Sequence, residues 1–300
     1  MNRRRFLKLA ALTGAGITLP CGLGRLITPV GASEGTDLAV VVGQDPAAMT
    51  RSAIDALGGI SKFISRNDIV VVKPNMAWDR TPELAANSNP EVVATVVKMC
   101  IEAGAAKVKV FDRTVNDPRR CYVQSGIGPA VSKLGADLKH VDERKFRDMT
   151  INGRAMKKWP LYTEVIEADK VINVPIAKHH GLAQLTMAMK NWMGVMGGSR
   201  RRIHQNLDQS LVDLSMFLRP TLTVLDAVRI LINNGPQGGA LSDVRLTNTV
   251  IAGVDQVAVD SYGASLFGMK GRDLGYVRIA ADSGMGVMDL SGLNIKKITL

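Results

Sequence analysis

Short runs of branched apolar residues alternate with longer amphipathic segments along most of this chain. Runs rich in Val and Ile, without strict alternation of apolar and polar positions, are typical of strands in a parallel sheet covered on both faces. The pattern predicts strands at Leu38–Val42, Ile69–Lys73, Lys107–Asp112, Asp137–Val141, Lys170–Val174, Thr221–Asp226 and Thr249–Asp255. We therefore expect an α/β fold with a mainly parallel, doubly wound sheet and helices on both faces.

The segments between these runs show helical periodicity. Pro90 directly follows Asn89, and Gly104 follows the last apolar position of the same segment, which are typical boundaries of a helix. The pattern predicts helices at Ala47–Ile54 with Ser61–Ile64, Pro90–Ala103, Gly126–Leu134, Leu182–Met193, Asp208–Leu218 and Val257–Leu266.

The first 32 residues have the features of an export leader. Residues 3–8 read Arg-Arg-Arg-Phe-Leu-Lys, an apolar stretch follows, and Val30-Gly31-Ala32 supplies small residues for cleavage. The apolar stretch is too short to span a bilayer and contains Gly14, Gly16 and Pro20. We predict a twin-arginine signal peptide at residues 1–32 and a single α/β domain at residues 33–300. The twin-arginine translocase is thus an expected partner, and the folded protein is expected in the periplasm or outside the cell.

The charge of the chain favours an anionic partner. The whole chain carries +11, and five of these charges lie in the leader, so the mature protein carries about +6. A moderate basic excess suits a small anionic molecule, an acidic partner or a lipid surface. Nucleic acid is not expected, because aromatic residues make up only 4% of the chain and no basic strand is studded with them. The sequence does not indicate an oligomeric state.

Cysteine usage limits the cofactors. Cys21 lies in the leader, so Cys100 and Cys121 are the only thiols of the mature chain. Two thiolates do not hold an iron–sulfur cluster, and none is expected. A disulfide is not expected either, because the predicted sheet places the two residues at opposite ends of the strand Lys107–Asp112.

Polar residues collect where the predicted strands end. In a parallel sheet the carboxyl ends of the strands share one edge, and ligands bind outside that edge. These predicted rim residues are Lys73, Asn75, Asp112, Lys178, His179, His180, Asp226 and Asp255. A single aspartate at such a position is an ordinary helix cap, but the whole set favours a functional site.

The rim residues suggest several roles. Lys73 follows an unbroken apolar run, so it would clamp an anion, act as a nucleophile if burial lowers its pKa, or pair with a nearby aspartate. Lys178 would share that work. Asn75 would donate to a substrate oxygen or close the turn after Pro74.

The histidine pair allows two kinds of chemistry. His179 and His180 point in opposite directions on an extended segment, so both are not expected to bind one metal. We predict His179 as a general acid–base. A structural role for the histidines and a metal site, in which one histidine joins an aspartate, are the alternatives. Asp112, Asp226 and Asp255 would bind that divalent metal or orient the cationic groups, although no typical metal-binding spacing occurs.

The segment from Lys190 to Gly198 is rich in glycine. Lys190 and Asn191 stand beside Gly194, and this arrangement would let a ligand approach the backbone closely. Arg200 lies in a run of three arginines that would either close over an anion or form a solvated turn. The segment is not a phosphate loop, because its lysine precedes the glycines. We predict Asn75, Lys190, Asn191, Gly194 and Arg200 as ligand-binding residues.

Four segments together resemble a known family. They are Lys73-Pro74-Asn75, Val171 to His180, the block Met189-Lys190-Asn191-Trp192-Met193-Gly194, and the run Gly253-Val254-Asp255-Gln256-Val257-Ala258-Val259-Asp260. The sequence resembles the domain-of-unknown-function family numbered 362, in its twin-arginine-exported form, over roughly residues 38–268. Some members carry four-iron ferredoxin segments, for which this chain lacks the cysteines. The resemblance implies the α/β fold and no settled reaction.

Two functions are consistent with these features. The first is a periplasmic protein that acts on or binds a small anionic ligand through the Lys/His/Asp rim, with or without a metal. The second is a non-catalytic cofactor-binding or maturation factor for an exported redox enzyme. Electron transfer through a haem is not expected, because no Cys-x-x-Cys-His motif occurs.

Overall fold

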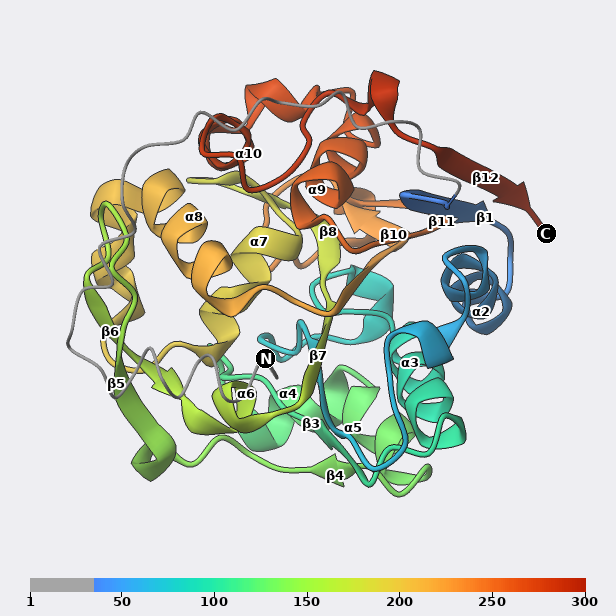
Figure 1. Cartoon of the computed structure of the whole chain (residues 1–300), viewed down its shortest axis with the longest axis horizontal. Coiled ribbons are helices and arrows are strands. Elements are labelled where there is room, and N and C mark those ends of the chain that lie inside the picture. Colours follow the sequence, from blue (N-terminus) through green and yellow to red (C-terminus); the bar gives the residue numbers. More distant parts are fainter. Residues whose placement is uncertain (1–34) are drawn as a thin grey trace, which may run out of the picture.

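The computed structural model of the chain describes residues 35–300, so the predicted leader lies outside the described residues. These residues form a twisted sheet with helices on both faces (Figure 1). The order of its main strands is β12-β1-β11-β10-β7-β2-β3-β4, and β8 and β9 extend it beside β10. Their bounds are β1 Leu38–Val42, β2 Ile69–Pro74, β3 Lys107–Val110, β4 Asp137–Leu138, β7 Lys170–Val174, β8 Ile176–His180, β9 Gln184–Thr186, β10 Leu222–Leu231, β11 Val244–Gly253 and β12 Ile295–Thr299. The prediction of a mainly parallel α/β sheet is confirmed.

Two hydrophobic cores cover the two faces of the sheet. Alternate side chains of a strand point to opposite faces, so Val70 and Val72 of β2 join one core and Val71 joins the other. The first core packs beneath α2 Pro46–Ala56, α3 Pro90–Glu102, α4 Pro118–Gln124 and α5 Ile127–Ser132. The second packs beneath α6 Thr163–Glu167, α7 Ala188–Asn191, α8 Leu207–Leu218, α9 Gln256–Ser265 and α10 Gly275–Asp282.

The two best-defined helix starts follow the sequence signals. Asp45 accepts hydrogen bonds from the amides of Ala47 and Ala48 and so caps α2, and Pro46 follows as the first helical residue. Asn89 caps α3 in the same way by accepting from the Glu91 amide. These caps fix where the chain turns after each preceding strand.

One strand runs against the others, and the sequence pattern did not predict this. β11 pairs antiparallel with β1 on one side and with β10 on the other, whereas the remaining main strands run in parallel. β10 and β11 are also longer than predicted and pair antiparallel over most of their length. The carboxyl end of β11 therefore lies at the edge opposite to the carboxyl ends of β2, β3 and β7.

The prediction of a helix at Leu182–Met193 is wrong for the first half of that segment. Residues 184–186 form β9, which pairs antiparallel with β8, and Gln184, the first residue of β9, adopts a positive φ of 59°. Only Ala188–Asn191 is α-helical, and a 3₁₀ turn, Trp192–Val195, follows it. The hairpin satisfies backbone groups of β8 that a helix would leave unpaired.

Further elements escaped prediction. A separate two-stranded sheet, β5 Phe146–Thr150 and β6 Lys158–Tyr162, pairs antiparallel. The strand β12 adds to the edge of the main sheet beside β1.

Cys100 and Cys121 are both buried, and each is a free thiol, so no disulfide joins them. Across residues 35–300, none of the helices combines the length and hydropathy that crossing a membrane requires.

Candidate functional site

A cavity of about 490 Å³ opens at the carboxyl ends of β2, β3 and β7, where the sequence placed the rim. We call it the lysine pocket, after Lys73, Lys178 and Lys190 in its wall. Trp78, Leu182 and Met193 supply apolar surface to the same wall. The structure brings together nine of the residues singled out from the sequence, namely Lys73, Asn75, Asp112, Lys178, His180, Lys190, Asn191, Gly194 and Arg200.

Lys73 forms a buried ion pair at the base of the pocket. Its Nζ lies 2.9 Å from Oδ1 of Asp112, and each side chain is only 1% exposed. Burial lowers the pKa of Lys73, whereas the carboxylate of Asp112 opposes that shift. Asp112 also accepts a 2.7 Å hydrogen bond from the Met76 amide. Of the roles considered for Lys73, the structure shows the ion pair directly.

Two asparagines connect Lys73 to Lys178. Asn191 Oδ1 accepts hydrogen bonds from Lys73 Nζ at 2.9 Å and from Asn75 Nδ2 at 3.2 Å. Asn75 Oδ1 in turn accepts from Lys178 Nζ at 3.2 Å. The amide of Asn191 donates to Asn173 Oδ1 at 2.8 Å, which fixes its orientation. The two lysines thus belong to one hydrogen-bonded array that is anchored in three different strands and in α7.

In the part of the chain that the structure describes, Lys178 and Lys190 have no carboxylate partner comparable to Asp112. Lys178 is fully buried, donates to the Ala86 carbonyl at 2.5 Å, and has a pKa well below its usual value because of burial. Lys190 is 7% exposed, and its Nζ lies 3.5 Å from the sulfur of Met193. Burial, with the neighbouring Arg200, lowers the pKa of Lys190 to about 7.

His180, and not the predicted His179, faces the pocket. Side chains alternate along β8, so Lys178 and His180 share one side and His179 points to the other. Nδ1 of His179 instead accepts a hydrogen bond from the Gly235 amide at 3.1 Å. Nδ1 of His180 accepts from the amides of Leu182 and Ala183, and burial lowers its pKa to about 3. His180 is therefore neutral, with its proton on Nε2.

The predicted trio of metal-binding aspartates is not one site. Asp226 is buried within β10 and accepts from the amides of Asn89 and Val228, and burial raises its pKa to about 6. Asp255 follows the reversed strand β11 at the opposite edge, where it caps α9 through the Val257 amide. Within residues 35–300, no three His, Cys, Asp or Glu side chains are grouped closely enough to hold a metal.

Gly194 is required by the close approach of the backbone to the ion pair. A Cβ at this position would lie 1.8 Å from Asp112 Oδ1 and 2.4 Å from Lys73 Nζ. Arg200 holds the same loops together, because it donates to the carbonyls of Arg113 and Thr114, each at 2.8 Å. The arginine thus has a positioning role in addition to its place in the pocket wall.

Asp260 and Gln256, which the rim argument did not select, hold the lysine-bearing segment in place. The buried carboxylate of Asp260 accepts from the amides of Ala188 (2.7 Å) and Met189 (3.1 Å), at the start of α7. Gln256 Oε1 accepts from the indole Nε1 of Trp192 at 3.0 Å. The run Gly253–Asp260 thus contacts the block Met189–Gly194, the two segments that carried the family resemblance.

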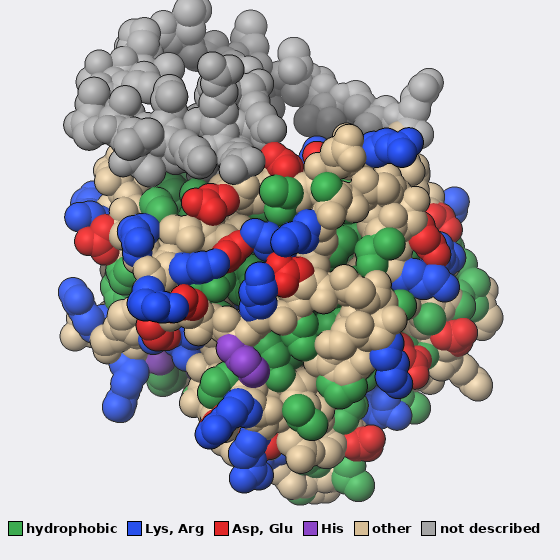
Figure 2. Space-filling view, turned by 90° about the horizontal axis from the view of Figure 1, so that it is seen from below, with side chains coloured by type: hydrophobic (Ala, Val, Ile, Leu, Met, Phe, Trp, Pro, Cys, Tyr) green, Lys and Arg blue, Asp and Glu red, His purple; other side chains and the backbone are tan. Residues whose placement is uncertain are grey.

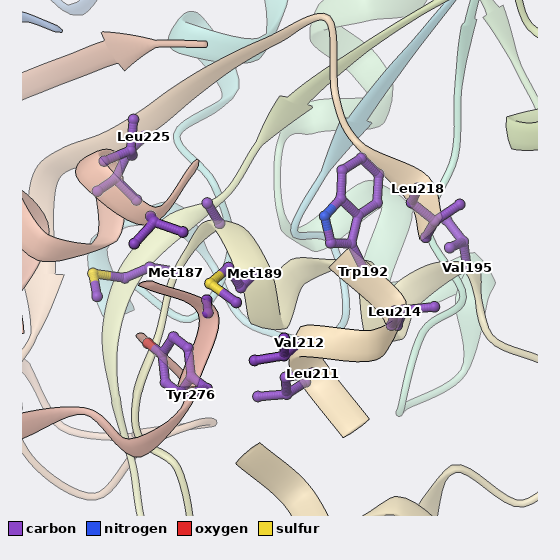
Figure 3. Close-up of a cluster of buried hydrophobic side chains, with 14 of the residues drawn as sticks. Met187, Met189, Trp192, Val195, Leu211, Val212, Leu214, Leu218, Leu225 and Tyr276 are labelled. Carbon is purple, nitrogen blue, oxygen red and sulfur yellow. The ribbon is translucent and has the colours of Figure 1, made fainter. Parts of the chain in front are cut away.

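The hydrophobic cluster beneath α7 completes this support (Figure 3). Met187, Met189 and Trp192 are fully buried in it, so these methionines are core residues. Because the apolar side of α7 is locked in the core, Lys190 and Asn191 are held at the pocket wall.

The positive charge of the pocket differs from that of the open surface. On the face shown in Figure 2, Lys and Arg side chains lie among Asp and Glu side chains. The described residues that line the pocket include six Lys or Arg and one carboxylate, Asp112. Burying a cation without a counter-charge costs free energy. An anion bound in the pocket would therefore stabilise the positively charged forms of these side chains.

Fold and site together define an α/β protein with a cationic cavity at the carboxyl edge of its sheet. Residues 70–265 match the family model described as Domain of unknown function (DUF362), and the chain belongs to this family. It is 28% identical over 221 residues to a thylakoid-associated protein of Synechocystis, a match that covers 71% of this chain and 67% of the relative.

Two solved structures are similar in architecture. The lactate racemase apoprotein from Thermoanaerobacterium thermosaccharolyticum aligns with a TM-score of 0.48 and 10% identity, covering 76% of this chain and 56% of that one. A structural-genomics protein from Thermotoga maritima aligns with a TM-score of 0.43 and 8% identity, covering 75% of this chain and 60% of that one. This chain thus spans less than two thirds of each, and no function is transferred from either.

Proposed function

We propose that this protein binds a small organic anion in the lysine pocket and does so in the periplasm. The observation that carries the proposal is the presence of Lys178 and Lys190 in the wall of a ligand-sized cavity, both buried and neither paired with a carboxylate of residues 35–300. A ligand carboxylate or phosphate would supply the missing counter-charge.

The walls of the pocket favour an organic anion over an inorganic one. Trp78, Leu182 and Met193 line it beside the lysines. Small-molecule sites are usually largely apolar, with a few polar groups that fix orientation. We infer that the charged end of the ligand contacts the lysines and that its carbon skeleton lies against these apolar side chains.

Paired titrations would test the proposal. Benzoate, succinate and phenyl phosphate, each compared by calorimetry with its neutral partner benzamide, succinamide or phenol, report whether charge drives binding. We expect at least one anion to bind about tenfold or more tightly than its partner, since one charge-assisted hydrogen bond contributes about 1.5–3 kcal/mol. Lys98→Met, which removes a lysine that is 57% exposed, should bind like the native protein. Binding in which no anion exceeds its neutral partner would refute the proposal.

The location follows from the leader and has its own test. Changing Arg3 and Arg4 together to lysine should hold the unprocessed protein in the cytoplasm, because the export route depends on paired arginines. Both residues are changed at once because Arg5 would form an alternative pair with Arg4. Fractionation and immunoblotting measure the outcome, with the native sequence as the control. Normal recovery of the mature double variant from the periplasm would show that the leader acts differently.

A further inference from the structure

We propose that Lys190 is a nucleophilic amine that forms an imine with a carbonyl group of the bound anion. This inference rests on the proposed function and names the ligand class more narrowly, as an organic anion that carries an aldehyde or ketone. It is argued from the contacts of the three pocket lysines, which differ in a way that singles out Lys190.

Lys73 and Lys178 are both engaged by oxygen acceptors. Lys73 pairs with Asp112 and also donates to the Pro74 carbonyl at 2.8 Å. Lys178 donates to the Ala86 carbonyl and to Asn75. A nucleophilic attack by either nitrogen would break these buried contacts, and the carboxylate of Asp112 additionally favours the protonated form of Lys73.

Among the described residues, Lys190 has neither an oxygen acceptor nor an ion-pair partner of this kind. Its Nζ has one polar contact among the described residues, the weak acceptor sulfur of Met193 at 3.5 Å. The side chain lies in the pocket wall, so a ligand atom can approach the nitrogen. A buried lysine next to another cationic group is a known form of activated amine.

The surroundings of Lys190 favour the unprotonated amine. Arg200, Lys178, His180 and His204 are the titratable groups that interact with it, and none is acidic. Because the pKa of Lys190 is lowered to about 7, its amine is unprotonated in about half of the molecules at neutral pH.

The reaction balances without another reactant. The lone pair of Lys190 Nζ attacks the ligand carbonyl carbon, the carbonyl oxygen takes up a proton, and the amine loses one. The resulting carbinolamine expels its hydroxyl group as water when a second proton reaches that oxygen and the nitrogen gives up its remaining proton. One C=N bond thus replaces one C=O bond, one water leaves, and no group is oxidised or reduced.

Trapping with borohydride tests this step. The full mature protein is incubated with 3-formylbenzoate or 4-formylbenzoate at pH 7, borohydride reduces any imine to a stable amine, and peptide mass spectrometry locates the adduct. We expect Lys190 to be labelled roughly tenfold or more faster than exposed lysines such as Lys98, because far more of it is unprotonated. The rate of labelling of Lys190 should rise as pH approaches 7 and level off above it, because its pKa is lowered to about 7.

Controls separate this inference from the proposed function. Excess benzoate, which carries the charge but no carbonyl, should protect Lys190. Lys190→Arg keeps the charge and should abolish the pocket adduct, and Lys98→Met should leave it unchanged. If benzoate binds in the pocket but Lys190 is labelled no faster than exposed lysines, the imine is refuted and anion binding stands. If neither aldehyde labels Lys190 and no anion of the titration panel binds, both proposals fail.

Discussion

Asp112→Ala is expected to lower the free energy of unfolding by about 3–5 kcal/mol, the usual cost of removing one partner of a buried ion pair. The substitution leaves the ammonium of Lys73 without its carboxylate, which lies 2.9 Å away in a site where both side chains are buried. It also leaves the Met76 amide without its acceptor. Urea unfolding monitored by circular dichroism measures the change.

The pH dependence of this variant gives a second check. Without Asp112, burial lowers the pKa of Lys73 further below that of the unfolded chain. The unfolded state then binds more protons between those two pKa values, so stability rises with pH up to about 10.5. The deficit should therefore shrink between pH 7 and pH 10. The double variant Asp112→Leu with Lys73→Met removes both charges and should recover much of the loss. A loss below about 1 kcal/mol in Asp112→Ala would contradict the ion pair.

Lys190→Met is expected to raise the stability of the ligand-free protein at pH 7 by about 1–4 kcal/mol and to abolish anion binding. The native pKa of Lys190 is lowered to about 7, while the unfolded value is near 10.5. The native protein thus loses stability as pH falls from 10.5 towards 7, and methionine removes this loss while keeping a similar volume.

Unfolding measured at several pH values tests this expectation. The difference between Lys190→Met and the native protein should be largest near pH 7 and should vanish near pH 10.5, as the sign of the shift requires. Lys98→Met is the matched control, because that lysine is exposed and should show no such trend. If the variant is less stable than the native protein at pH 7, the contacts of Lys190 stabilise the fold by more than the burial of its charge destabilises it, and the expectation is wrong.

Local patterns carried most of the fold prediction. Apolar runs predicted β1, β2 and β7, because strands buried on both faces leave an unbroken apolar signal. β3 reads Lys-Val-Lys-Val, and only its valines are buried. Strand direction has no such signal, so the reversal of β11 was missed, and with it the position of Asp255. The half-exposed edge strand β12 reads Ile-Lys-Lys-Ile-Thr and is too polar to stand out.

The candidate site was predictable where it depended on strand ends. Lys73 and Asp112 follow neighbouring parallel strands, and the pairing of β2 with β3 brings them together. The choice between His179 and His180 depends on which face of β8 meets the pocket, which one sequence does not show. Asp260 was missed because the role of an acidic residue in the largely buried helix α9 depends on the start of α7, which lies beside it only in the folded chain.

A crystal of the mature protein soaked with 4-bromobenzoate tests the central claim most directly, because anomalous scattering distinguishes bromine from the lighter atoms of the protein and solvent. The account predicts a bromine peak inside the lysine pocket, near Trp78, Leu182 or Met193, with the carboxylate against Lys178 or Lys190. A bromine peak elsewhere, with the pocket empty at a saturating concentration, would contradict it.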